Sequence, residues 1–347
     1  MKFGIISVFP PAARAVELLQ LAERLDFDDF WVADSHVIWN EVSALMGYLA
    51  GQSTSTTMRF GMMVGNPVSR DPLVVASAMA TLRQILGEGR VLCGMGRGDS
   101  VVRVVGRKPS TISELESAMK LIRTTTSGDT ATVDDGTDVH MPWVSGKAIP
   151  VIAAAYGPRM LAAAGRSADG VIIECADPSY ISWAMDHVRA GAAEVGRDLT
   201  DFEVVAANAT CVSENLDQAR ETVRPFGAVI GNMVAEIMRN VGANNLPPDF
   251  EALNNSRTEY DYYKHVHSDT AQADYVPDEM IDRLTIIGTA ERCAERVREL
   301  EAVGVTRICF YSQTSSYEAD MMQYSEHVLP LFRDSAGVAQ VTAAGAR

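Results

Sequence analysis

The sequence predicts a (β/α)8 TIM barrel with an insertion between its seventh and eighth strands. Short apolar runs of the β type alternate with helical patterns along the 347 residues, which is typical of βα units around a parallel sheet. Eight such runs can be assigned, which is the number that closes this barrel. The first run is followed by Phe9-Pro10-Pro11 rather than by a glycine-rich turn, which disfavours the main alternative, a doubly wound dinucleotide-binding sheet.

The first half of the chain supplies four of these strands and the helices between them. The strands are expected at residues 2–8, 29–33, 59–64 and 91–95. Helices are expected from Ala12 and from Pro72, because apolar residues then recur at three- and four-residue spacing on one face. Thr111 and Glu114 form a capping box, in which each side chain satisfies an unpaired amide of the first helical turn.

The second half supplies the other four strands and the irregular part of the chain. The strands are expected at residues 150–155, 170–174, 202–209 and 306–311. Asp177 and Pro178 are the expected N-cap and first-turn proline of a helix. Residues 224–283 break the rhythm and predict an insertion that forms helices and a lid, or a subunit contact, beside the barrel mouth. Residues 1–333 are therefore expected to form one domain, followed by a flexible tail at 334–347.

Charge and cysteine usage narrow the class of protein. The formal net charge of −15 argues against nucleic acid or an anionic membrane as a partner, because both reward clustered Lys and Arg. No apolar run approaches the ~20 residues of a membrane span, and the N-terminus does not fit a signal peptide. The five cysteines are scattered and odd in number, which predicts buried free thiols and a cytoplasmic location.

Glycine-rich segments follow two of the expected strands, at the end where the loops of a barrel build its site. Residues 94–100 read Gly-Met-Gly-Arg-Gly-Asp-Ser, and residues 154–158 read Ala-Ala-Tyr-Gly-Pro. Glycines let the backbone approach a ligand closely, Arg97 adds positive charge, and Gly157 starts a helix whose N-terminus can hold an anion. These segments predict a cradle for the phosphate or ribityl chain of a cofactor. A tight strand exit is the alternative for the first segment.

Asp34 and His36 follow the second strand and are the candidate catalytic residues. Asp34 ends a buried strand and is expected to point into the barrel mouth, and a histidine can exchange a proton near neutral pH. A structural Asp–His hydrogen bond is the alternative. No metal site is expected, because the sequence has no metal-ligand spacing. It also lacks a Gly-x-Ser-x-Gly motif and a phosphate loop ending in Gly-Lys-Ser/Thr.

Three motifs taken together resemble the luciferase-like superfamily of flavin and deazaflavin oxidoreductases. They comprise residues 65–72 (Gly-Asn-Pro-Val-Ser-Arg-Asp-Pro) with 89–90 and 94–99, residues 154–158 with 168–170, and residues 277–282 with 287–288. The resemblance spans almost the whole chain, from Phe3 to about Phe332. It is closest to the deazaflavin-dependent branch that includes methylenetetrahydromethanopterin reductase.

The resemblance implies an oxidoreductase that transfers a hydride between coenzyme F420 and a small organic substrate. An FMN-dependent monooxygenase that uses O2 and reduced flavin is the alternative, and a non-catalytic flavin-binding barrel is a minor one. The cofactor ring would lie in the mouth against a bulge that holds a non-prolyl cis peptide bond at Met63–Val64. The cofactor-binding residues implied are Met63, Val64, Asn66, Gly96, Arg97, Ala155, Tyr156, Gly157 and Pro158.

The chain departs from this family pattern in one place. Deazaflavin-dependent sugar dehydrogenases carry Asp-His directly after strand two, whereas here Ser35 separates Asp34 from His36. This leaves open which side chain relays a proton, and a substrate of the glucose 6-phosphate type is not supported. Members of the superfamily often dimerise through the helices beside the second and third strands, so the resemblance also implies a homodimer.

Overall fold

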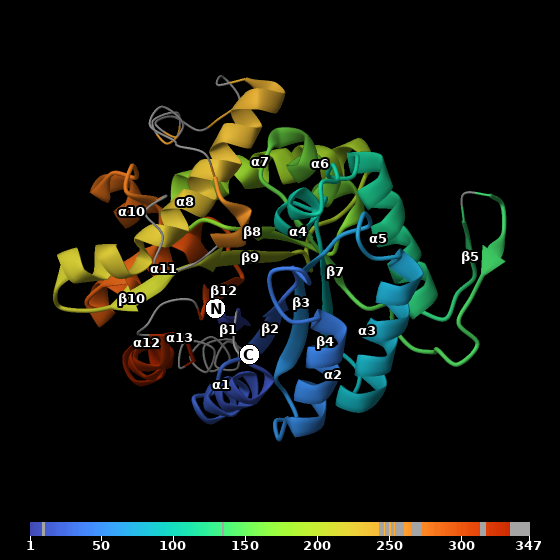
Figure 1. Cartoon of the computed structure of the whole chain (residues 1–347), viewed down its shortest axis with the longest axis horizontal. Helices are drawn as coiled ribbons and strands as arrows, with labels where there is room; N and C mark the ends of the chain where they lie inside the picture. The colour runs from blue at the N-terminus through green and yellow to red at the C-terminus, as the bar shows by residue number, and fades with distance from the viewer. Residues whose placement is uncertain are drawn as a thin grey trace, which may run out of the picture.

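Eight parallel strands close into a barrel in this computed structural model, which describes residues 1–8, 11–133, 135–242, 246, 250, 253, 260–264, 273–312 and 317–333. The strands follow one another around the barrel in the order β1-β12-β9-β8-β7-β4-β3-β2 (Figure 1). The strands are β1 Lys2–Ser7, β2 Asp29–Ala33, β3 Arg59–Gly65, β4 Val91–Met95, β7 Val151–Ala154, β8 Gly170–Ile173, β9 Glu203–Asn208 and β12 Arg307–Tyr311. The predicted fold class is therefore confirmed, and every predicted strand matches within two residues at each end.

Helices surround the barrel and begin at the residues that the sequence marks. Helix α1 begins at Ala12 and α3 at Pro72, the Thr111–Glu114 capping box opens α5, and Asp177 caps α7. The helices are α1 Ala12–Arg24, α2 Val42–Gln52, α3 Pro72–Leu86, α4 Ser100–Val104, α5 Ile112–Thr126, α6 Pro158–Ser167, α7 Pro178–Glu194, α8 Leu216–Val241, α10 Asp278–Leu284, α11 Ala290–Ala302, α12 Tyr317–Gln323 and α13 Pro330–Arg333. A 3-10 turn spans Tyr262–Lys264, and a π-helical segment spans Tyr324–Val328.

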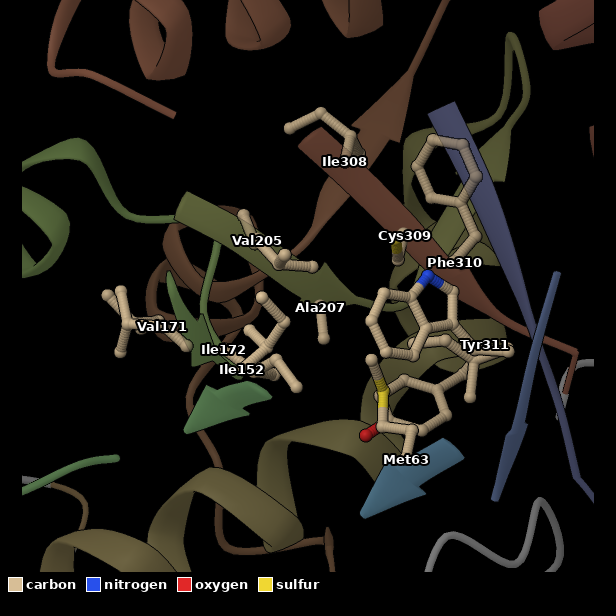
Figure 2. Packing of buried hydrophobic residues seen from close by; sticks show 14 of the residues in the cluster. Met63, Ile152, Val171, Ile172, Val205, Ala207, Ile308, Cys309, Phe310 and Tyr311 are labelled. Atoms are coloured by element: carbon tan, nitrogen blue, oxygen red, sulfur yellow. The ribbon is translucent and has the colours of Figure 1, made fainter. Parts of the chain in front are cut away.

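Side chains of the strands alternate between the interior of the barrel and its helical shell, as the strand period requires. Figure 2 shows Ile152 and Ile172 pointing into the space between the strands, whereas Val171 points away from it. Trp31 is fully buried and needs Gly61 beside it, because a Cβ on that glycine would lie 2.1 Å from the indole ring. The interior is thus a packed core, and a ligand site is expected at one end of the barrel.

Four charged residues close the end of the barrel at which the strands begin. They are the first residues of β2, β3, β9 and β12, namely Asp29, Arg59, Glu203 and Arg307. Arg59 donates to Asp29 at 2.9 Å and, through both terminal nitrogens, to Glu203 at 2.7 and 2.8 Å. Arg307 donates to Glu203 at 2.5 Å and to Asp29 at 2.7 Å. This ion-pair ring, as we call the four residues, carries no net charge.

The ion-pair ring controls the titration of its glutamate. Burial by itself would raise the pKa of Glu203, but hydrogen bonds and charge interactions with Arg59 and Arg307 lower this pKa from 4.5 to about 2. The ionised carboxylate is therefore more stable in the folded chain than in the unfolded chain, so the ring stabilises the fold at neutral pH.

The irregular part of the chain starts earlier than the sequence suggested. Helix α8 begins at Leu216, before the expected boundary at 224, because Asn215 caps it by accepting from the amide of Gln218 at 3.1 Å. A two-stranded parallel sheet, β10 (Thr210–Val212) with β11 (Ile286–Gly288), joins the two ends of this region. Parts of 243–272, together with Phe9, Pro10 and the predicted tail 334–347, lie outside the described residues.

A small antiparallel hairpin, β5 (Ala131–Thr132) with β6 (Asp138–Val139), projects from the body beyond α5 (Figure 1). Neither this hairpin nor α2 was assigned from the sequence.

Candidate active site

A pocket opens at the end of the barrel opposite to the ion-pair ring. It holds about 1500 Å³ of empty space, including the part open to solvent. Its lining includes Ala33, Ala154 and Tyr311, which are the last residues of β2, β7 and β12. Helix α8 covers one side of the pocket through Val229, Met233 and Ile237, among others. Residues 224–283 were expected to form helices and a lid, or a subunit contact; the second half of α8 falls in this range.

Most of the candidate residues come together in this pocket. Asp34, Met63, Val64, Asn66, Gly96, Arg97, Tyr156, Gly157 and Pro158 line it. His36 and Ala155 are not among the lining residues. Ala155 is fully buried and lies behind the lining, with its amide donating to the carbonyl of Ile172 at 3.2 Å.

Strand β3 ends in the bulge that the resemblance implies. The peptide bond Met63–Val64 is cis, and the register between β3 and β4 shifts between Met62 and Gly65. The backbone amide of Asp34 donates to the carbonyl of Met63 at 2.9 Å, and that of Gly96 donates to the carbonyl of Gly65 at 2.8 Å. The bulge is thus held from both neighbouring strands and presents Met63 and Val64 to the pocket.

The exit from β4 needs glycine for a steric reason. A Cβ on Gly94 would lie 2.2 Å from the Met62 carbonyl oxygen, and a Cβ on Gly96 would lie 3.1 Å from the Val64 side chain. Gly98 has φ +91°, a conformation that other residues rarely adopt. These glycines therefore let the bulge and the β4 exit pack against each other beside an open pocket.

Arginines and an uncapped helix mark another part of the lining. Helix α6 starts after Gly157, and no side chain caps its first turn. Arg97 donates from Nε to the Ser110 carbonyl at 2.5 Å, which fixes its guanidinium at the pocket wall. Arg159 also lines the pocket. Positive side chains beside a helix N-terminus form an environment that favours an anion.

The residues after β2 are arranged differently from the simple Asp–His expectation. Asp34 is buried and accepts two hydrogen bonds from Arg70, at 2.6 and 2.8 Å. Ser35 lies in the pocket, where its hydroxyl is 2.6 Å from that of Ser100. The Nδ1 atom of His36 is 3.8 Å from the nearest Asp34 oxygen and has no hydrogen-bond partner in the described part of the chain. The structure therefore brings Ser35, rather than His36, into the mouth.

A carboxylate with two phenols is a feature that the sequence interpretation missed. Glu174 follows β8 and accepts hydrogen bonds from the hydroxyls of Tyr156 and Tyr311 on opposite oxygens. All three residues line the pocket. Burial, followed by the nearby Glu174 charge, raises the pKa of both tyrosines well above 10, so both remain neutral donors. A carboxylate at the end of a barrel strand was the one signal that could have identified Glu174.

A second polar cluster, at the edge of the pocket, centres on an arginine. Arg103 pairs with Asp99 at 2.6 Å and with Glu236 of α8 at 3.1 Å. Both carboxylates line the pocket. This cluster ties the loop after β4 to the helix that covers the mouth.

Comparison with known proteins places the chain in a family. The family model described as luciferase-like monooxygenase matches residues 1–307. The chain belongs to this luciferase-like family. The 5,10-methylenetetrahydromethanopterin reductase of Archaeoglobus fulgidus is 31% identical to this luciferase-like protein over 322 residues, covering 89% of the chain and 92% of that relative.

Solved structures support the same fold. The coenzyme F420-dependent tetrahydromethanopterin reductase from Methanopyrus kandleri aligns with a TM-score of 0.73 and 22% identity over 96% of this luciferase-like protein and 99% of that chain. An F420-dependent secondary alcohol dehydrogenase in complex with an F420-acetone adduct aligns with a TM-score of 0.75 and 21% identity, over 96% of this chain and 99% of that chain.

Two kinds of feature are absent from the described residues. No group of three or more His, Cys, Asp or Glu side chains among them is placed to hold a metal ion. No described helix combines the length and apolarity that crossing a membrane requires. All five cysteines are buried and free, as the sequence predicted.

Proposed function

We propose that the protein is an F420-dependent oxidoreductase that transfers a hydride between the deazaflavin and a small organic substrate in the mouth of the barrel. The observation that carries this proposal is the pocket between the Met63–Val64 bulge and the glycine-rich exits of β4 and β7. Its support is the similarity, over nine-tenths of the chain, to a reductase whose family includes enzymes named as F420-dependent.

The residues present fit the ring of such a cofactor. A Cβ on Gly96 would lie 3.1 Å from Val64 and 3.6 Å from Ala154, so a larger residue there would narrow the lining beside the bulge. We assign the ring to the face formed by Met63, Val64 and Asn66. The amide oxygen of Asn66 accepts from the amides of residues 68 and 69 at 3.1 and 2.9 Å, which holds the loop after β3 in place.

The residues near α6 fit the anionic tail of the cofactor. Gly157, Pro158 and Arg159 present an uncapped helix start and a cation to the pocket, and Arg97 adds a second cation. Tyr180 donates to the Tyr156 carbonyl at 2.9 Å, which fixes the backbone that leads into this helix. The sign of the charge therefore suits a phosphodiester.

The remaining side chains of the pocket have different roles toward the substrate and the loops around it. When bound, a deazaflavin supplies a ring carbon that takes up or releases a hydride. The chain then positions the substrate and keeps water away, through apolar lining such as Met63, Val229 and Met233. Because both oxygens of Asp34 are bonded to Arg70, we assign Asp34 to fixing the loop after β2. The Ser35–Ser100 hydroxyl pair then faces the substrate in place of His36.

Cofactor titration tests this proposal. The purified protein is mixed separately with F420 and with FMN, and binding is followed by the absorbance and fluorescence of each cofactor. The proposal requires that F420 binds and undergoes reduction or oxidation with a substrate. Binding of FMN alone would favour the monooxygenase, and binding without any redox turnover would favour the binding-only barrel.

We assign the protein to the cytoplasm as a homodimer that buries α2 and α3. Tyr48 on α2 and Val74 and Ile85 on α3 are 49%, 64% and 51% exposed, so both helices present apolar side chains that such a contact could bury. Buried free cysteines fit a reducing compartment. Sedimentation of the wild type and of Val74→Glu tests the interface, because a monomeric wild type would contradict it.

A further inference from the structure

Glu174 differs from the other carboxylates of the pocket because no described residue pairs with it as a cation. Asp34 pairs with Arg70, and Asp99 and Glu236 both pair with Arg103. Within the described part of the chain, no Arg, Lys or His nitrogen lies within 4 Å of the Glu174 carboxylate. Among the described residues, Glu174 is therefore the one carboxylate of the pocket lining that has no cation beside it.

The hydrogen bonds around Glu174 make this part of the pocket an acceptor surface. Each phenol has one hydroxyl proton, and Tyr156 and Tyr311 both donate it in a hydrogen bond to the Glu174 carboxylate. The lone pairs that remain on the carboxylate and the phenol oxygens can only accept. A ligand group that fits here must therefore donate hydrogen bonds.

The two hydroxyl donors, from Tyr156 and Tyr311, fix the orientation of the Glu174 carboxylate in the pocket wall. Apolar side chains form part of the same lining: Ile172 of β8 lies two residues before Glu174, and Val229 and Met233 belong to α8. A charge in such surroundings is costly unless it is paired. A positively charged ligand group would provide the missing partner.

We propose that Glu174, Tyr156 and Tyr311 form a substrate subsite that binds a protonated amine or a comparable cationic N–H group. The substrate would then belong to the class of amines. This proposal rests on the proposed function, because it requires that substrate and cofactor both bind in this pocket. Substrates that carry a carboxylate or phosphate at this position are disfavoured by like charge. Neutral alcohols of the same shape bind, but more weakly.

A matched pair of small probes tests the subsite in the wild type. Benzylamine, which is charged at pH 7, and benzyl alcohol, which is neutral, have nearly the same shape. Calorimetric titration into the cofactor-loaded protein and into the protein without cofactor gives the affinity for each. A close charge pair should favour the amine by at least about tenfold. Equal affinities in both forms would overturn the subsite without any variant.

Two variants test whether the preference for benzylamine over benzyl alcohol depends on Glu174. Glu174→Gln keeps the size and an acceptor for one phenol but removes the charge, so the two probes should then bind within about twofold of each other. Glu236→Gln removes a charge from the edge of the same pocket, where Arg103 already pairs with that carboxylate, and should retain the preference. If both variants lose it equally, the general charge of the mouth, rather than the subsite, attracts amines, and the proposal fails.

A third variant separates charge from hydrogen bonding. Tyr311→Phe removes one donor from Glu174 and leaves the charge, so the preference for the amine should persist. Its loss in this variant alone would contradict the assignment to the carboxylate. Thermal unfolding of each variant identifies a protein that has not folded. F420 binding without an amine preference disproves the subsite alone, whereas an amine preference without F420 binding disproves the proposed cofactor alone.

Discussion

Replacement of Glu203 by glutamine should destabilise the barrel without affecting its mouth. Each pKa unit corresponds to about 1.4 kcal/mol, so a pKa lowered from 4.5 to about 2 makes the ionised carboxylate worth about 3 kcal/mol to folding at neutral pH. Glu203→Gln leaves Arg59 and Arg307 sharing Asp29 as the one charged acceptor within the ion-pair ring. We therefore expect the free energy of unfolding to fall by about 3 kcal/mol, near the range for breaking a buried ion pair.

The pH dependence of stability carries the same sign. Because the folded-state pKa is depressed, the contribution is complete above about pH 4.5 and is lost as the pH falls towards 2. Urea denaturation at several pH values between 7 and 3 should therefore show the difference between wild type and Glu203→Gln narrowing at acid pH. Tyr311 lies four residues from Arg307 along β12, roughly 13 Å away at strand spacing, so cofactor binding should not change.

A matched control is available on the surface. Glu194 pairs with Arg166 at 2.8 Å and is 57% exposed, so Glu194→Gln should change stability by less than about 1 kcal/mol. If Glu203→Gln is no less stable than Glu194→Gln at pH 7, or if its deficit is the same at pH 3, the stabilising role of the ion-pair ring is refuted.

Three further predictions concern the mouth. Gly94→Ala should weaken cofactor binding, because its Cβ would lie 2.2 Å from the Met62 carbonyl oxygen, and unchanged binding would show that the bulge can move. Gly157→Asp should weaken cofactor binding, because it places a negative charge where the anionic tail is assigned. Gly157→Ala should not, because the nearest described atom to its Cβ is Ile237 Cγ1, at 3.6 Å. Equal cofactor titration curves for the two variants would contradict the assignment of the tail to this helix start. His36→Ala should lower the turnover rate less than Ser35→Ala does, because Ser35 lines the pocket and His36 does not. The reverse order in steady-state kinetics would show that His36, rather than Ser35, takes part in the reaction.

The barrel was predictable because its strands are buried and local signals mark the helix starts. A strand covered on both sides becomes a short apolar run, which is visible without any partner. The Thr111 capping box and the Asp177 cap involve residues close in the chain, so their hydrogen bonds follow from local sequence. Helix α2 was not predicted because it is apolar on most of its faces, so its apolar residues show no three- and four-residue spacing.

The site was only partly predictable, because its chemistry depends on contacts between distant strands. Tyr156, Glu174 and Tyr311 come from three different strand ends and carry no recognisable spacing. The orientation of residues 34–36 also depends on the fold, since the pairing of Asp34 with Arg70 fixes which side chains face inwards. Glycine-rich exits, by contrast, are local, and the sequence placed Gly96 and Gly157 in the mouth.

The ion-pair ring has a consequence for altering this protein by design. It consists of residues that begin strands, whereas the pocket is lined by residues at or after strand ends and by α8, so the stabilising charges and the ligand contacts occupy separate positions in the chain. Mutant libraries directed at the pocket lining can accumulate mildly destabilising changes while the opposite end keeps the barrel closed. A screen for new substrates should therefore leave the first residues of β2, β3, β9 and β12 untouched and vary the loops after the same strands.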